Sequence, residues 1–181
     1  MNTTGLRSTG MAAATAVWGL RGKVVHGHAR GGSQLGFPTA NVAMNDAVVA
    51  ALTPMKNGVF CGFAAVETEP LEVLPMVMSV GFNPHFKDQT LTAEVHFVHK
   101  FEKDFYVSVI RVAAIARLRE QKQYDSLQGL IDDIRNDCRN GVEAVRQHVV
   151  AGAEYIAALA PADGAGDETR FEANLQPRSK M

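Results

Sequence analysis

The fold class follows from residues 91–99, which read Leu91-Thr92-Ala93-Glu94-Val95-His96-Phe97-Val98-His99. Apolar and polar side chains alternate along this stretch, so that Leu91, Ala93, Val95 and Phe97 would share one face of a strand. Thr92, Glu94 and His96 would share the other face. The stretch therefore predicts a half-buried β-strand whose polar face carries one carboxylate, Glu94.

Further strands are expected on both sides of this one. They are rich in Val, Phe, Ile and Ala, and they cover residues 17–25, 58–66, 73–80 and 106–118. Pro75 indicates that the strand over 73–80 begins at a sheet edge or at a bulge. Asn83-Pro84 marks a turn before Leu91.

The hydrophobic period changes from two to 3.6 at Asp125, which predicts a helix. Asp125 or Ser126 can cap its N-terminus, with Gln128 placed for a capping box. The apolar residues that recur at helical spacing are Leu127, Leu130, Ile131, Ile134, Cys138, Val142, Val145 and Val149. Several strands followed by one long amphipathic helix, which could extend or restart through 154–159, predict an antiparallel barrel or sandwich packed by a C-terminal helix.

Composition predicts one folded domain with an extension at each end. The chain has 181 residues, is 46% hydrophobic and has a net charge of −1. We expect a leader over 1–16, the domain over 17–160 and a flexible tail over 161–181. The charge balance argues against a protein that coats nucleic acid, and the chain lacks an apolar run of the ~20 residues that a membrane span needs. We expect a monomer with no nucleic-acid or membrane partner.

The N-terminal third contains a loop dense in glycine. Gly27, Gly31, Gly32 and Gly36 precede Phe37-Pro38-Thr39-Ala40-Asn41, and no acid occurs before Asp46. Glycines let backbone N–H groups approach phosphate oxygens, and a positive field attracts anions. By themselves the glycines favour a tight structural turn, because the spacing matches neither the Walker pattern nor the dinucleotide fingerprint.

Thr39 and Asn41 would point the same way from an extended segment. A hydroxyl and an amide oxygen suit Mg²⁺ that takes its other ligands from phosphates and water, although both residues could merely cap a turn. Glu94 could accept the proton of an attacking hydroxyl, or it could belong to a solvated strand face. The pairs His26/His28 and His96/His99 lack the partners that a zinc site needs.

A run of charges precedes the expected helix. Residues 117–122 read Arg-Leu-Arg-Glu-Gln-Lys, and Tyr124 follows. The simplest interpretation is a solvated loop between strand and helix. As a functional element, the loop would place cations and Tyr124 at the mouth of a barrel, beside a helix N-terminus.

These candidates follow one another in the order found in riboflavin kinases, and the resemblance covers about residues 22–146. The Pro-Thr-Ala-Asn block at 38–41 resembles the nucleotide and metal loop of that family, and Glu94-Val95-His96 stands where the family carries its catalytic Glu. The other matching stretches are 58–62, Ser79-Val80-Gly81-Phe82-Asn83-Pro84, Phe101 with 104–106, Leu118-Arg119, 124–127, Leu130-Ile131, Ile134 and Asp137.

The resemblance implies a six-stranded antiparallel Greek-key β-barrel with a long C-terminal α-helix. It implies an enzyme that transfers the γ-phosphate of ATP, its co-substrate, to the 5′-hydroxyl of riboflavin, giving FMN and ADP. The implied cofactor is Mg²⁺, or Zn²⁺ or Mn²⁺ in its place. The 181 residues show no resemblance to the nucleotidyl-transferase module of some relatives, so we expect the monofunctional type.

Residue roles carried over from the family form four groups. Glu94 would be the base, and Thr39 and Asn41 would hold the metal. Gly27, Ser33, Thr39, Asn41, Phe97, His99 and Tyr106 would contact ATP. Arg119, Lys122 and Tyr124 would hold the flavin.

Three positions depart from the family pattern. Ser33 replaces a frequent Lys, so a phosphate contact would be lost or supplied by Arg30. Glu120 replaces a usual Pro, and Phe82 replaces a common Trp. The first two leave open a barrel that binds flavin or nucleotide without turnover, and a structural interaction domain would require the whole motif order to be accidental.

The chain ends in Arg178-Ser179-Lys180-Met181, close to the peroxisomal Ser-Lys-Leu signal. We therefore expect a cytoplasmic protein, or one sent to peroxisomes or glycosomes. The first twenty residues, rich in Thr, Ser and Ala, also fit a transit peptide.

Overall fold

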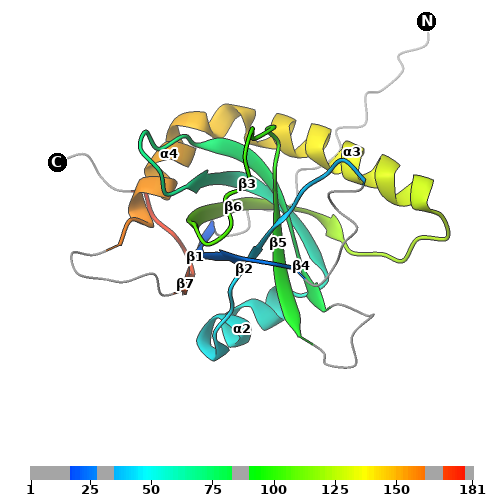
Figure 1. Ribbon diagram of the computed structural model, residues 1–181, viewed down its shortest axis with the longest axis horizontal. Coiled ribbons are helices and arrows are strands. Elements are labelled where there is room, and N and C mark those ends of the chain that lie inside the picture. Colours follow the sequence, from blue (N-terminus) through cyan, green and yellow to red (C-terminus); the bar gives the residue numbers. More distant parts are fainter. Residues whose placement is uncertain (1–16, 28–34, 83–89, 162–168, 178–181) are drawn as a thin grey trace, which may run out of the picture.

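The computed structural model describes residues 17–27, 35–82, 90–161 and 169–177, and its centre is a closed barrel of antiparallel strands (Figure 1). Six strands form the barrel, and a seventh is added outside it. Their bounds are β1 Trp18–Val25, β2 Ala40–Val42, β3 Gly58–Val66, β4 Leu74–Phe82, β5 Leu91–Phe97, β6 Val109–Glu120 and β7 Arg170–Glu172.

The barrel closes because β2 pairs with both β5 and β1. The strand order around the barrel is β1-β2-β5-β4-β3-β6, and β6 pairs with β1 again. Strands β3, β4 and β5 follow one another as neighbours, and β6 returns to lie beside β3, which is a Greek-key arrangement. The expected six-stranded antiparallel barrel is confirmed.

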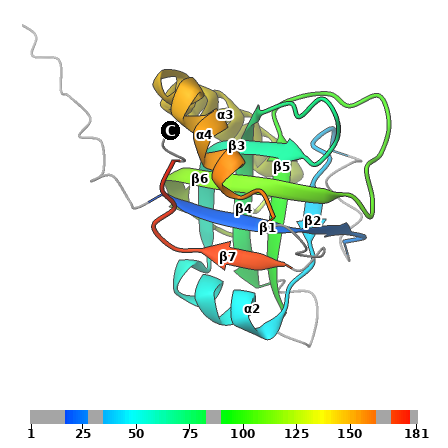
Figure 2. The ribbon, with the colours of Figure 1, turned by 90° about the vertical axis from the view of Figure 1, so that its left-hand side faces the viewer.

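The helices cover two opposite sides of the barrel. Helices α3 and α4 lie along one side, and the short α2 lies on the other, in both views (Figures 1 and 2). Their bounds are α2 Asp46–Leu52, α3 Leu127–Val145 and α4 Val149–Ala158, with short 3₁₀ turns at Thr53–Met55 and Arg146–His148. Asn45 caps α2, and Ser126 caps α3 by accepting a hydrogen bond from the Gly129 N–H.

One hydrophobic core fills the barrel. Along β5 the exposed fractions alternate as the sequence predicts: Leu91, Ala93, Val95 and Phe97 are buried, and Thr92, Glu94 and His96 are half-buried. The same inner core takes residues from every barrel strand. Its largest members include Trp18, Leu20, Phe60, Met76, Met78 and Ile110.

A second core lies outside the barrel, under α3 and α4. It joins Cys61, Phe63 and Ala113 of the sheet to Val145, Ile156 and Leu159 of the helical segment. At Gly141 an added Cβ would stand 3.0 Å from the Cβ of Cys61, so a glycine lets α3 approach the sheet closely. The outer face of the barrel is therefore partly a packed interface and not a uniform solvent surface.

Three elements differ from the sequence expectation. Helix α2 was not expected, since its seven residues carry no long periodic pattern. Strand β2 has three residues, in a segment that was expected to be extended but not to pair as a strand. The expected flexible tail contains β7, which pairs with β1, and Leu175 is 7% exposed, so flexibility from residue 161 is corrected for 170–175.

Several expectations lie outside the described residues. They are the leader over 1–16, Arg30, Gly31, Gly32, Ser33, Asn83-Pro84 and the C-terminal Ser179-Lys180-Met181. Within the described ranges, no helix is long and apolar enough to span a membrane.

Candidate active site

A row of polar side chains crosses the outer face of the barrel. Asn41 of β2 stands opposite Glu94 of β5, and Glu94 stands opposite Ser79 of β4. Directly opposed residues of antiparallel strands point to the same face, so the three side chains share the outer surface. The register thus brings the motif at 38–41 beside Glu94, 53 residues further along the chain from Asn41.

Glu94 is the carboxylate at the centre of this row. Burial raises its pKa above the ordinary value of a Glu, and a hydrogen bond from Thr39 opposes that shift without cancelling it. The Thr39 Oγ1 donates to Glu94 Oε2 over 3.4 Å. A carboxylate with a raised pKa accepts a proton more readily than a solvated one.

Asn41 is packed against Gly27 at the end of β1. A Cβ added at Gly27 would stand 2.2 Å from Asn41 Nδ2, so no larger residue fits without moving the amide. This close approach explains why a glycine stands at position 27, which the sequence alone did not explain. The glycine makes room for the Asn41 side chain.

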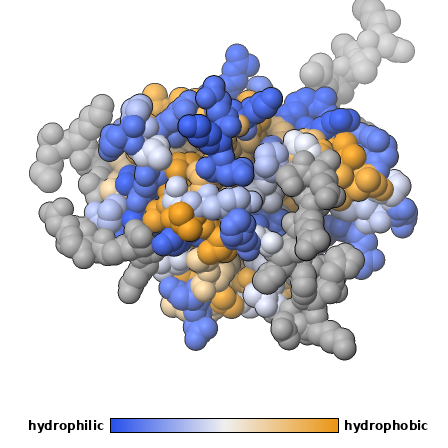
Figure 3. All heavy atoms as spheres, viewed as in Figure 1, coloured by the Kyte–Doolittle hydropathy of each residue, from blue (hydrophilic) through white to orange (hydrophobic). Residues whose placement is uncertain are grey.

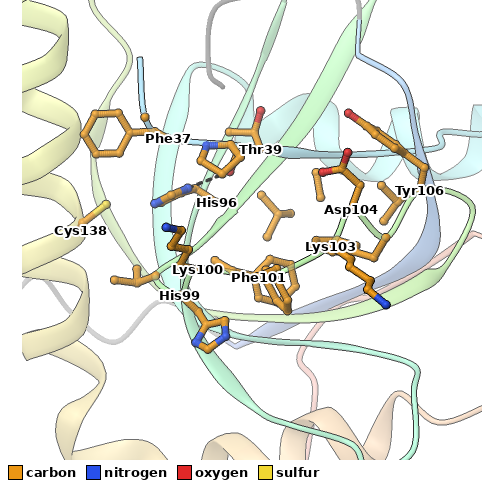
Figure 4. Close-up of a pocket in the computed structure, with 18 residues that line it drawn as sticks. Phe37, Thr39, His96, His99, Lys100, Phe101, Lys103, Asp104, Tyr106 and Cys138 are labelled. Atoms are coloured by element: carbon orange, nitrogen blue, oxygen red, sulfur yellow. Dashed lines mark hydrogen bonds between the residues drawn. The ribbon is translucent and has the colours of Figure 1, made fainter. Parts of the chain in front are cut away.

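Two cavities lie side by side next to Thr39, which is hydrogen-bonded to Glu94 of this row (Figure 4 shows the first cavity). The first has a volume of about 540 Å³ and lies between the Gly36–Ala40 segment and the chain from Val95 to Tyr106. The second has about 740 Å³ and lies between the sheet, the 119–124 loop and α3. Phe37, Thr39, His96 and Cys138 line both.

Several aromatic rings line the first cavity. Phe97 is 3% exposed and meets Phe101 and Phe105 edge-on, so most of this side chain belongs to the barrel core. His99 meets Phe101 edge-on at 4.9 Å, and Tyr106 stacks on His26 at 3.8 Å. All three expected nucleotide residues of this region line the cavity. The lining is suited to a flat ring system.

The second cavity combines apolar walls with charged groups at its mouth. Its apolar lining includes Val59, Val77, Phe82, Leu130 and Ile134. Apolar atoms are visible over the N-terminal half of α3, at the right of Figure 3. Glu94 also lines this cavity and lies at the side where it meets the first.

Arg119 is held by a buried acid of α3. Its Nε and Nη2 donate to both carboxylate oxygens of Asp137, at 2.9, 3.1 and 2.6 Å, and its Nη1 donates to the Glu120 carbonyl. Burial alone would lower the pKa of Arg119, but the bond to Asp137 outweighs it and raises the pKa. The planar fork is therefore fixed in one orientation at the cavity wall.

Lys122 and Tyr124 are tied to a second acid of α3. Lys122 Nζ lies 2.7 Å from Asp133 Oδ2, and the Tyr124 hydroxyl donates to the same oxygen over 2.9 Å. Burial and then the bond to Asp133 raise the pKa of Tyr124 to about 12. The hydrogen bonds from Lys122 and Tyr124 lower the pKa of Asp133. One carboxylate thus fixes two residues of the 119–124 loop.

The structure brings most of the expected site residues together. Arg119, Lys122 and Tyr124 line the second cavity, Thr39 lines both, and Gly27 and Asn41 stand beside them. Ser33 lies outside the described residues. Glu120 ends β6 opposite Gly58, so the strand itself holds the position where a Pro was expected.

Sequence reasoning missed the site roles of His96, Asp133 and Asp137. Asp133 and Asp137 are four residues apart, a spacing that puts both on one face of α3 and could have indicated a shared task. His96 shares the polar face of β5 with Glu94, which was visible in the alternation.

The described residues contain no group of three or more His, Cys, Asp or Glu side chains placed to hold a metal ion. Thr39 and Asn41 could offer a hydroxyl and an amide oxygen beside the Glu94 carboxylate. This donor set fits a hard divalent cation that takes its remaining ligands from phosphates and water.

Two adjoining cavities on the outside of a β-barrel, with a carboxylate of raised pKa beside the residues that they share, are features of an enzyme that brings two ligands together. The model of the family described as riboflavin kinase (Flavokinase) matches residues 15–145. The chain belongs to the riboflavin kinase family, whose members phosphorylate riboflavin to FMN with ATP as the phosphate donor.

Individual relatives agree. The chain is 41% identical to the human riboflavin kinase over 118 residues, which are 65% of this chain and 74% of that protein. It is 36% identical to the riboflavin kinase of Pyricularia oryzae over 132 residues, 66% of each chain, so it spans about two thirds of that relative's length. The crystal structure of riboflavin kinase from Trypanosoma brucei matches with a TM-score of 0.69 at 33% identity, covering 87% of this chain and 97% of that one.

Proposed function

We propose that this chain transfers the terminal phosphate of ATP to the 5′-hydroxyl of riboflavin at the junction of the two cavities, with Glu94 as the general base. The observation that carries the proposal is the position of Glu94. It lies in the second cavity, and Thr39, which lines both cavities, is hydrogen-bonded to it.

The first cavity is assigned to ATP and the second to riboflavin. Aromatic walls that include His99 and Tyr106 suit the adenine and ribose, and Gly27 and the Thr39–Asn41 segment lie where the phosphates would approach. The larger cavity offers apolar walls for the flavin rings, with Arg119, Lys122 and Tyr124 at its polar side.

The reaction joins the riboflavin 5′-oxygen to the γ-phosphorus and breaks the bond from that phosphorus to the bridging oxygen of ADP. The hydroxyl proton passes to Glu94. Thr39 and Asn41 would hold Mg²⁺, which neutralises charge on the phosphate oxygens when bound. Positioning and charge stabilisation supply most of the rate in this class, and the base supplies less.

The test is FMN formation from riboflavin and Mg-ATP by the purified chain. Glu94→Gln keeps the shape of the side chain and removes the base, so kcat should fall about 10²-fold or more while both substrates still bind. Glu72→Gln, at an exposed acid away from both cavities, is the matched control and should match the parent. A folded parent that makes no FMN would refute the proposal.

A further inference from the structure

We propose that His96 is a positioning residue of the reaction: it fixes the Pro38–Thr39 segment against β5 and so sets the place of the Thr39 hydroxyl. This inference rests on the proposed function, in which Thr39 and Asn41 hold the metal. The structural basis is the short pairing between β2 and β5, which ends just before Thr39.

The backbone ladder between β2 and β5 is only two residue pairs long. Ala40 pairs with Val95 and Asn41 pairs with Glu94. Continuing the register would place Thr39 opposite His96, but Thr39 lies before the first residue of β2. Pro38, the residue before it, has no N–H to donate. The segment that carries Thr39 therefore lies beyond the backbone pairing.

The His96 side chain supplies the contact that the ladder does not. Its Nδ1 lies 2.8 Å from the Pro38 carbonyl oxygen, drawn as a dashed line in Figure 4. A carbonyl oxygen only accepts, so Nδ1 carries the hydrogen and the ring tautomer is fixed. The ring also meets Phe37 edge-on, with centroids 5.6 Å apart. His96 thus holds two consecutive residues immediately before Thr39.

The second side-chain contact between this segment and β5 is weaker. Among the described residues it is the bond from Thr39 Oγ1 to Glu94, which at 3.4 Å is long for a hydroxyl donor. That bond uses the hydroxyl hydrogen, which leaves the oxygen lone pairs available to a cation. Their direction depends on the backbone of Thr39, and the bond from His96 fixes the adjacent peptide. Removing the imidazole donor should therefore act through the metal.

The experiment compares His96→Ala, His96→Asn and His96→Gln. The Asn amide N–H can take the place of Nδ1–H, whereas the Gln amide lies one carbon further out. Calorimetry would measure the binding of a non-hydrolysable ATP analogue with Mg²⁺ and with a chelator. We expect His96→Ala to weaken binding about tenfold in Mg²⁺ and to leave metal-free binding unchanged, as losses of residues that orient metal ligands do. His96→Asn should restore most of the difference.

Steady-state kinetics provide the second readout. In His96→Ala the KM for Mg-ATP should rise and kcat should fall, and the KM for riboflavin should change less than the KM for Mg-ATP. If His96→Ala does not fold, the comparison of His96→Asn with His96→Gln tests the role of His96, because only Asn keeps an N–H donor at the position of Nδ1. Equal losses with and without Mg²⁺, or no rescue by Asn, would overturn the role of His96. A parent chain that forms no FMN would instead refute the proposed function.

Discussion

As the proposed base, Glu94 would serve the reaction at a cost to the stability of the fold. Burial raises its pKa, so the folded protein binds this proton more tightly than the unfolded chain does. The favourable contribution of Glu94 to folding is therefore fully present below its unfolded pKa and is lost as pH rises through its folded pKa. At neutral pH the ionised carboxylate destabilises the folded protein, as is common at catalytic positions.

This shift predicts the pH profile of the enzyme. The base works only when ionised, so kcat/KM should fall as pH drops through the pKa of Glu94, and the midpoint should lie above the ordinary Glu value of about 4.3. Initial rates measured across the acid range would give the midpoint. The residual activity of Glu94→Gln should lack this acid limb, and an unchanged limb in that variant would assign it to another group.

Gly27 gives a second prediction at the scale of one residue. An alanine Cβ there would stand 2.2 Å from Asn41 Nδ2, and the flexible end of the Asn41 side chain is what would move. We expect Gly27→Ala to fold normally and to lose activity by a factor similar to Asn41→Ala, with a higher Mg²⁺ requirement. Activity titrated against Mg²⁺ checks this. A double variant no worse than either single variant would show that the two act through the same amide.

At the scale of elements, α3 both covers the barrel and carries the acids that position the 119–124 loop. Asp137 fixes Arg119, and Asp133 fixes Lys122 and Tyr124. Both acids lie on the helix face turned toward the second cavity. The shape of the flavin side of the site thus depends on a helix whose apolar residues are packed on the sheet.

The prediction for this element is a substitution at Asp133. Asp133→Ala removes the shared acceptor of Lys122 and Tyr124, so both side chains lose their anchor. We expect the KM for riboflavin to rise about three- to tenfold, the effect of one or two hydrogen bonds, with the KM for ATP unchanged. Asp132→Ala is the matched control, because Asp132 is exposed and its carboxylate bonds to Gln128 and Arg135 of its own helix. Equal changes in both variants would contradict the assignment.

The sequence predicts some of these elements well and others not at all, for physical reasons. The alternation in Leu91–Phe97 and the 3.6 period after Ser126 are local patterns, and both elements appear where expected. Strands β2 and β7 have three residues each, and pairing with distant strands decides whether they exist. Asp133 looks like an ordinary helix surface acid until the loop is folded back over it. Its role depends on tertiary structure and leaves no local signal.

At the scale of the whole molecule, the proposed reaction site lies outside the barrel, and the barrel interior is filled by the hydrophobic core. The inner core takes the apolar face of each strand, so the outer face is free to carry Asn41, Glu94 and Ser79.

On the opposite part of the barrel, Glu67 accepts hydrogen bonds from Arg21 and Arg111. Burial alone would raise the pKa of Glu67, but these bonds outweigh it and lower the pKa, so its contribution to folding is present above its unfolded pKa and is lost as pH falls through its folded pKa.

The C-terminal segment closes this opposite part, and that gives the last prediction. Strand β7 pairs with β1 (Figure 2). Arg170 donates to the Leu159 and Ala160 carbonyls after α4, and the Leu175 side chain is 7% exposed in the second core. Of the described residues, none from 169 to 177 lines either cavity. Leu175→Ala should therefore lower the free energy of unfolding by about 2–3 kcal/mol, the cost of a buried Leu truncation, and leave kcat and both KM values unchanged. Urea unfolding followed by circular dichroism would measure the loss, with Gln176→Ala, at an exposed neighbour, as the control. A midpoint equal to that of the parent would show that this segment does not stabilise the barrel, whereas a loss of activity in a stably folded variant would mean that the segment reaches the site.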